Sequence, residues 1–202
     1  PERSKASSIR NMNDPYPKPS LSVDTVVMRY RNGHLEVLLI ERQGTPYSGY
    51  WALPGGFVDE NEAPRQAAIR ELREETAVSD VPMIEIGSFG AENRDPRGWV
   101  VSIAFLALAS AGCRVSAGDD ASQVQWYRLN EMPKLAFDHE DIISTAITVL
   151  RQRMQFDSFP LHLLQKNFRT KEARHLYSQL LGHPIDQRAF KAWLRRRQAV
   201  KR

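Results

Sequence analysis

The sequence predicts an α/β protein with two modules: a mixed α/β module at 20–138 and a small helical module at 139–202. Short apolar segments separated by turn residues fill the first module, and apolar residues at helical spacing fill the second. The net charge also differs between the two parts of the chain, because residues 1–150 carry −6 and residues 151–202 carry +10. The basic end is either a solvated tail or a module with its own partner. Residues 1–19 are polar and are expected to form a flexible tail.

The first module is expected to begin with a β-hairpin. Asn32-Gly33 supplies the two positions of positive φ that a type I′ turn requires, between strands expected at 22–30 and 35–40. The segment 51–58 is typical of a strand, a glycine loop and a second strand.

One helix and three more strands complete the prediction for this module. The helix is expected at 63–76, where Ile69, Leu72 and Thr76 recur at helical spacing and would share one side. The strands are expected at 83–89, 99–109 and 124–129.

The second module is expected to contain three helices, at 140–154, 170–181 and 186–199. Thr170 and Asp186 are the expected N-caps of the last two, because a side-chain oxygen can accept from the first backbone amides. Gly182 with Pro184 is expected to end the middle helix. The junction between the modules is expected between residues 137 and 160.

Composition excludes several classes of protein. Cys113 is the single cysteine, which excludes a disulfide framework and a cysteine-rich zinc site and favours the cytoplasm. No run of about 18 apolar residues is present, so no membrane span is expected. The first 20 residues contain no apolar stretch typical of a signal peptide.

An unusual group of carboxylates lies in the helix expected at 63–76. Glu71, Glu74 and Glu75 fall within about a turn and a half, and like charges at this spacing destabilise a helix by roughly 0.2–0.5 kcal/mol per pair. They also lie in its C-terminal half, where the helix dipole disfavours anions. A surface helix with Arg–Glu pairs is the simplest alternative. A bound Mg²⁺ or Mn²⁺ would offset the repulsion, since hard cations prefer oxygen ligands.

The surrounding residues resemble the Nudix box, which is Gly-x5-Glu-x7-Arg-Glu-hydrophobic-x-Glu-Glu-x-Gly-hydrophobic. The resemblance implies the Nudix fold, a mixed sheet sandwiched by helices. One position departs, because Ala77 stands where the family has glycine, at a helix end that favours left-handed backbone. The matching residues are Gly56, Glu62, Arg70, Glu71, Leu72, Glu74, Glu75 and Val78.

The resemblance also implies roles for individual residues. Glu71, Glu74 and Glu75 would bind the metal, with the Gly55 carbonyl as a further ligand. Glu62 and Arg70 would orient these carboxylates and complete the catalytic set. The implied reaction is attack by water on a pyrophosphate that joins a nucleoside to another group. The catalytic base lies outside the box in many family members, and Glu131, Asp119 and Asp120 are the candidates.

Two segments, 51–57 and 95–102, resemble those Nudix proteins that handle ADP-ribose. Arg97 would bind a phosphate as a planar donor, or would lie in an ordinary loop turn. Trp51 would stack on adenine or would pack in the core. Gly56 would let the backbone approach the substrate closely.

The end of the chain resembles the winged-helix domain of Nudix-related transcriptional regulators of NAD metabolism. The resemblance rests on Ala136-Phe137-Asp138-His139 and on residues 180–190. On the last helix Phe190, Trp193 and Leu194 would be buried. The residues that would contact DNA are Arg188, Lys191 and Arg195.

That module departs from the regulators because no β-hairpin wing is evident after its last helix. A dimerisation module or a lid is the alternative, and the chain is expected to form a homodimer.

The sequence therefore predicts two alternative functions. The first is a Mg²⁺-dependent pyrophosphohydrolase of a nucleoside diphosphate derivative, ADP-ribose in particular. The second is a DNA-binding regulator of NAD metabolism that senses ADP-ribose through its Nudix domain.

Overall fold

The computed structural model describes residues 16–118, 121–165 and 167–200. The chain opens with the expected hairpin of β1 (Ser20–Arg31) and β2 (His34–Arg42). Asn32 and Gly33 both have positive φ, 51° and 83°, as a type I′ turn requires. The predicted strand, glycine loop and strand form β3 (Trp51–Ala52) and β4 (Gly55–Phe57).

The seven strands of the described residues join one mixed sheet, in which the order is β3-β2-β1-β6-β5. The remaining members are β5 (Met83–Phe89), β6 (Val100–Ala109) and β7 (Ala121–Arg128), which pairs with β2. β1 and β6 are parallel, whereas β4 pairs with the start of β1 in the antiparallel sense. The glycine loop is therefore fixed at the N-terminal end of the central strand.

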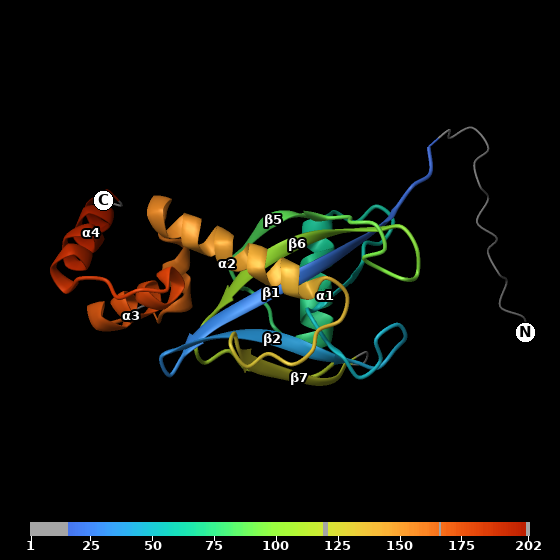
Figure 1. Cartoon of the computed structure of the whole chain (residues 1–202), viewed down its shortest axis with the longest axis horizontal. Helices are drawn as coiled ribbons and strands as arrows, with labels where there is room; N and C mark the ends of the chain where they lie inside the picture. Colours follow the sequence, from blue (N-terminus) through green and yellow to red (C-terminus); the bar gives the residue numbers. More distant parts are fainter. Residues whose placement is uncertain (1–15, 119–120, 166, 201–202) are drawn as a thin grey trace, which may run out of the picture.

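The two faces of the sheet are covered by different helices (Figure 1). Residues from alternate positions of β1 divide between the faces, with Val23 and Val27 on one side and Val26 and Met28 on the other. The first pair packs with α1 (Pro64–Thr76), and the second with α2 (His139–Phe156). The expected sheet sandwiched by helices is confirmed.

Helix α1 ends where the Nudix-box pattern departs. Ala77 takes the left-handed C-cap conformation, with φ 57°, and its amide donates to the Arg73 carbonyl at 2.9 Å. The prediction that Ile69 shares the buried side is wrong, since Ile69 is 40% exposed. The buried stripe follows Ala68, Leu72 and Thr76 at i, i+4 spacing, and Ile69 is rotated about 100° away from it.

The helical module contains η1 (Phe159–Leu163), α3 (Thr170–Leu181) and α4 (Gln187–Val200) beyond α2. Asp186 caps α4, because its Oδ1 accepts from the amides of Arg188 and Ala189, both at 2.9 Å. The N-cap of α3 is Arg169 rather than Thr170, and Glu172 accepts from the Arg169 amide instead. In the described part of the chain no strand follows α2.

The core continues from the sheet into this module. The cluster that contains Met28 and Leu106 also contains Leu150, Leu176 and Phe190. No helix among the described residues is long and apolar enough to cross a membrane.

Candidate functional site

The Nudix-box helix places Arg70 among three carboxylates. Its guanidinium donates to Glu62 Oε1 and Oε2 at 2.9 and 2.8 Å and to Glu71 Oε1 at 2.7 Å. It also reaches Glu74 Oε2 at 3.3 Å and the Phe57 carbonyl at 3.1 Å. One guanidinium therefore orients three acidic side chains, as the resemblance to the Nudix box implied for Arg70.

The glycine loop lies directly against these carboxylates. The Gly55 amide donates to Glu75 Oε2 at 2.8 Å. A side chain at Gly56 would collide with the Glu71 carboxylate, and a side chain at Gly55 would collide with the Val23 carbonyl. Glycine is required at position 55 because the Val23 backbone leaves no space for a Cβ, whereas a side chain at position 56 would displace the Glu71 carboxylate.

The electrostatics of this acidic patch are unbalanced. Glu62, Glu71 and Glu74 pair with Arg70, which also lies 3.7 Å from Asp59, and Glu75 accepts from the Gly55 amide. Burial, together with Glu74 and Glu62, raises the pKa of Glu71 against the influence of Arg70. A hydrogen bond from Arg70 lowers the pKa of Glu62, and the carboxylates raise the pKa of Arg70. The patch carries surplus negative charge and hard oxygen donors, which suit a divalent cation.

The donors are not assembled as a closed cation cage. Within the described ranges, no three His, Cys, Asp or Glu side chains converge in metal-binding geometry. Arg70 holds Glu71 and Glu74 at this point, so a cation would have to draw these carboxylates from the guanidinium. Gly55 and Gly56 nevertheless bring the backbone of the loop directly against the Glu71 and Glu75 carboxylates.

A cavity of about 80 Å³ opens on the other side of the glycine loop. Arg97 lines it, paired with Asp95 through its Nε (3.0 Å to Oδ1) and Nη2 (2.6 Å to Oδ2). Arg42 is a second cation of the lining. Its side-chain Nε donates to the Pro46 carbonyl at 3.0 Å. The lining residues are Ser22, Val23, Asp24, Arg42, Leu53, Gly55, Gly56, Phe57, Arg94, Asp95, Arg97, Phe137 and His139.

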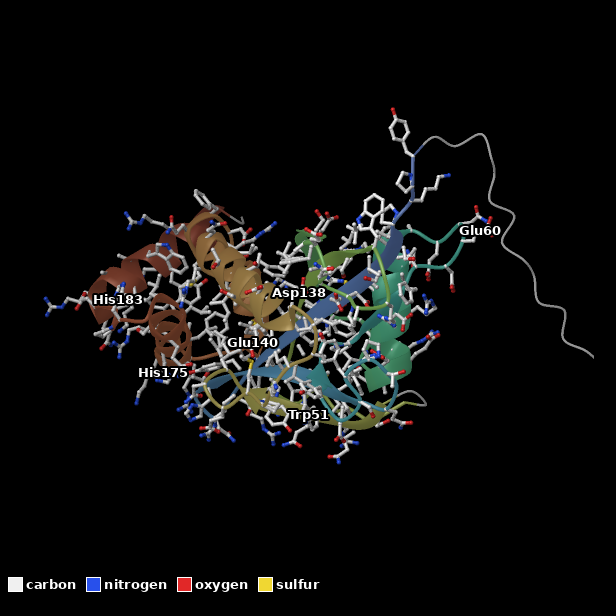
Figure 2. The ribbon with its side chains drawn as sticks, turned by 45° about the vertical axis from the view of Figure 1, so that its right-hand side comes forward. Trp51, Glu60, Asp138, Glu140, His175 and His183 are labelled. Carbon is white, nitrogen blue, oxygen red and sulfur yellow. The ribbon has the colours of Figure 1, made fainter. Side chains whose placement is uncertain are left out.

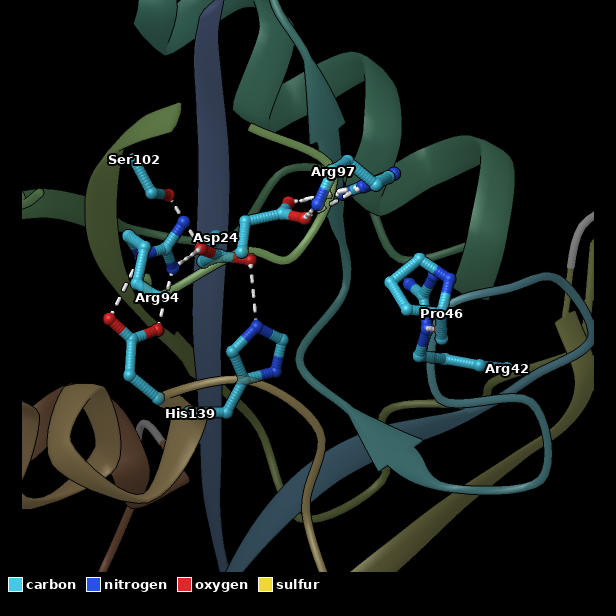
Figure 3. Close-up of polar contacts among 9 residues, drawn as sticks. Asp24, Arg42, Pro46, Arg94, Arg97, Ser102 and His139 are labelled. Carbon is cyan, nitrogen blue, oxygen red and sulfur yellow. Dashed lines mark hydrogen bonds and ion pairs between the residues drawn. The ribbon is translucent and has the colours of Figure 1, made fainter. Parts of the chain in front are cut away.

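A buried ion network contributes to the lining of this cavity, and Figure 3 shows its polar contacts. Asp24 Oδ2 accepts from Ser102 Oγ at 2.5 Å and from Arg94 Nη2 at 3.3 Å. Arg94 also binds Asp138 Oδ1 at 2.6 Å and Oδ2 at 2.8 Å. Burial alone would raise the pKa of Asp24, but its contacts with His139, Ser102 and Arg94 outweigh burial and lower the pKa from 3.8 to about 2.

His139 connects this network to the glycine loop. The Leu53 amide donates to its Nδ1 at 2.9 Å, and its Nε2 lies 3.3 Å from Asp24 Oδ1. The hydrogen-bond geometry assigns the ring proton to Nε2, since a nitrogen that accepts from an amide carries none. The first helical residue of α2 thus holds the backbone that lines the site.

The structure brings together most of the predicted site residues but not all. Trp51 lies outside the cavity lining and packs edge-on against Tyr127, with ring centroids 4.9 Å apart. Glu131 is exposed and pairs with Arg128 at 3.2 Å, away from the cavity. Asp119 and Asp120 lie outside the described residues.

Sequence reasoning missed Asp24, Arg42, Arg94 and His139 as parts of this site. A usable signal existed for Asp24, because it is the one charged residue in the strand segment 20–28. Nothing local marks Arg94, whose partners are 44 and 70 residues away along the chain.

The last helix presents two different faces, as predicted. Phe190 and Leu194 are buried and Trp193 is half-buried. The cations of the other face are exposed; they are Arg188, Lys191 and Arg195.

Comparison with known proteins agrees with the site geometry. The model of the NUDIX domain matches residues 19–146, and the chain belongs to the Nudix family. The chain is 33% identical over 180 residues to the ADPR responsive transcriptional repressor NtrR of Acinetobacter baylyi, which covers 87% of this chain and 72% of that protein.

Two further relatives are similar to this chain, an enzyme and a protein whose structure contains bound DNA. The ADP-ribose pyrophosphatase of Methanocaldococcus jannaschii is 42% identical over 130 residues, 63% of this chain and 73% of that protein. The crystal structure of Shewanella oneidensis NrtR complexed with a 27mer DNA has a TM-score of 0.78 at 35% identity and covers 87% of this chain and 82% of that one. The second likeness includes the helical module.

Proposed function

We propose that the Nudix module hydrolyses the pyrophosphate of a nucleoside diphosphate derivative, with ADP-ribose as the substrate. The observation that carries this proposal is the acidic patch beside the glycine loop, next to a cavity lined by Arg42 and Arg97. The 42% identity to an ADP-ribose pyrophosphatase supports this substrate.

Each group of residues has a distinct task in this proposal. Glu71, Glu74 and Glu75, with the Gly55 carbonyl, would hold Mg²⁺ or Mn²⁺. A bound divalent cation supplies charge neutralisation at the phosphates and lowers the pKa of water. Arg97, held by Asp95, presents a planar guanidinium to the substrate phosphates.

A hydrolysis assay on the purified full chain tests this function. ADP-ribose should give AMP and ribose 5-phosphate in the presence of Mg²⁺ or Mn²⁺ and no product in EDTA. NADH and dinucleoside polyphosphates serve as competing substrates. If no nucleoside diphosphate derivative is hydrolysed with either metal, the site binds its ligand without turnover.

A second function is supported by the helical module. We propose that residues 139–202 bind duplex DNA within a homodimer and that ADP-ribose regulates this binding, in a regulator of NAD metabolism. The exposed cationic face of α4 carries the proposal, and the repressor that matches 87% of the chain supports it. The residues proposed to contact DNA are Arg188, Lys191 and Arg195.

Salt dependence of DNA binding tests this second function. Replacing Lys191 and Arg195 by Ala should make the slope of log K against log salt shallower by about 4, since each phosphate contact contributes roughly 0.9 and the homodimer loses two contacts per protomer. Replacing Arg73 and Arg128 on the Nudix module by Ala is the matched control and should leave the slope unchanged. Equal slopes for both double variants would reject α4 as the DNA-binding surface, and light scattering would test the homodimer.

A further inference from the structure

Phe137 has an uncommon backbone conformation at the entrance to α2. Its φ is 54°, in the left-handed region that a bulky side chain rarely adopts. It lines the cavity and lies two residues before the first residue of α2. A conformation of this kind persists only where the surrounding contacts hold it.

Two cations and two aromatic rings hold the Phe137 side chain. The guanidinium carbons of Arg42 and Arg97 lie 4.9 and 5.6 Å from the ring centroid. The rings of Tyr47 and His139 lie 4.8 and 5.3 Å from it, between centroids. The ring is thus in contact both with the cations of the cavity and with the first residue of α2.

The two guanidiniums repel each other across this ring. Burial, together with Arg97, lowers the pKa of Arg42, which shows that the charge is costly there. A diphosphate in the cavity would attract both cations, because charge-assisted bidentate hydrogen bonds to phosphate are stronger than partly exposed cation–π contacts. Turning Arg42 and Arg97 toward phosphate removes both from the ring.

Helix α2 connects this point to the helical module. Asp138 and His139 fix its first turn to Arg94 and Asp24. The helix has 18 residues, a length of about 27 Å. Near its other end the Arg151 Nε donates to the Leu180 carbonyl at the end of α3, at 2.5 Å. Figure 2 shows Asp138 at the start of α2 and His183, which lies between α3 and α4, at the far side of the module.

We propose that Phe137 couples the ligand cavity to the helical module: a bound diphosphate draws Arg42 and Arg97 from its ring, and α2 then shifts against α3 and α4. This inference rests on the proposed function and adds the residues that regulate DNA binding. Arg42 becomes a ligand-binding residue, and Phe137 a positioning residue that acts through α2. The ligand can shift the DNA-binding helix only by binding the two arrangements with different affinity.

Hydrogen exchange on the full chain tests the coupling without knowledge of the DNA target. The probe is the non-hydrolysable α,β-methylene analogue of ADP-ribose with Mg²⁺, at a concentration that calorimetry shows to be saturating for each variant. In the wild type, exchange should slow at 53–57 and change by at least roughly fivefold in α3 and α4, the low end of typical coupling. In Phe137→Asn, which removes the ring but tolerates left-handed backbone, the change in α3 and α4 should fall below about twofold.

Three further variants separate coupling from general damage to the fold. Phe137→Tyr keeps the ring and should restore the change in α3 and α4. Arg42→Gln removes one stacked cation and should reduce the change even if Phe137→Asn fails to fold. Phe156→Ala truncates the same residue type at the other end of α2, where the side chain is 80% exposed, and should behave as the wild type.

The outcomes distinguish the two hypotheses. Slower exchange at 53–57 without a change in α3 and α4 in the wild type would overturn the coupling and leave the proposed ligand site intact. A full change in both Phe137→Asn and Arg42→Gln would overturn the assigned path. No effect at 53–57 in the wild type at calorimetric saturation would place the ligand outside the proposed site and overturn the coupling with it.

Discussion

Two ion networks flank the glycine loop, and they differ in composition and exposure. On α1, Arg70 is shared by Glu62, Glu71 and Glu74, and the Glu74 side chain is 52% exposed. On the α2 side, all four carboxylate oxygens of Asp24 and Asp138 have a donor within 3.3 Å.

The difference agrees with the ligand-binding role proposed for the first network and with a structural role for the second. The acidic patch has more carboxylates than Arg70 can satisfy, and the Glu74 side chain is half exposed, so the patch would gain from a divalent cation. Each carboxylate oxygen of the buried network has a donor. Any exchange of these partners would destabilise the fold, because an unpaired buried charge is costly. The first should therefore tolerate neutral substitutions in the absence of metal, and the second should not.

The largest effect is expected for Glu74→Gln with Glu75→Gln. Loss of metal ligands should lower kcat/KM for ADP-ribose by roughly 10³-fold, equivalent to about 4 kcal/mol of transition-state stabilisation. Urea unfolding in EDTA should show equal or slightly higher stability, since repulsion worth a few tenths of a kcal/mol is relieved. Calorimetry with Mg²⁺ should show no binding.

The matched control for this pair is Glu60→Gln with Glu85→Gln, two exposed carboxylates outside the patch. It should leave both rate and Mg²⁺ affinity unchanged. Wild-type Mg²⁺ affinity in the Glu74, Glu75 variant would remove the distinction between the two networks.

The next largest effect is expected for Asp24→Asn. It leaves Arg94 and His139 facing a neutral amide in a buried site, which should lower the free energy of unfolding by about 3 kcal/mol. Urea denaturation at pH 7 measures this loss. Asp141→Asn, an exposed aspartate in the first turn of α2, should change stability by less than about 0.5 kcal/mol. Equal effects of the two substitutions would show that the buried network is not structural.

A smaller effect is expected from acid alone. The pKa of Asp24 is lowered in the folded state, from 3.8 to about 2, so its ionised form contributes stability that is present above pH 3.8. That contribution, on the order of 2 kcal/mol, is lost as the pH falls through about 2. Unfolding free energies between pH 6 and pH 2 should fall less steeply in Asp24→Asn than in the wild type. Parallel pH curves would contradict the assigned pKa.

The smallest effect is expected for Ala77→Gly, at the end of the acidic helix. Ala77 is exposed and has a φ of 57°, so glycine should relieve strain and stabilise the fold by up to about 1 kcal/mol. Ala189→Gly, in the first turn of α4, should have the opposite sign because its backbone is helical. Thermal unfolding of both variants measures these opposite changes in stability. It thereby tests whether Ala77 affects only the local backbone geometry.

Local interactions were predictable from the sequence. The turn at Asn32-Gly33, the cap at Asp186 and the left-handed Ala77 each depend on neighbours a few residues away. Arg70 and Glu74 lie on adjacent turns of one helix, so their pairing follows from helical spacing. Ile69 was misassigned because spacing alone does not say which of two adjacent stripes faces the sheet.

The sequence by itself determined the chemistry of the acidic patch, since the box fixes carboxylates, arginine and glycines within 20 residues of one another. Only the tertiary structure decided which residues lie across the cavity from that patch. Asp24 and Arg94 are 70 residues apart, and Leu53 and His139 are 86 residues apart. Such pairs meet because β1 pairs with β6 and α2 returns across the sheet, which local propensity does not encode.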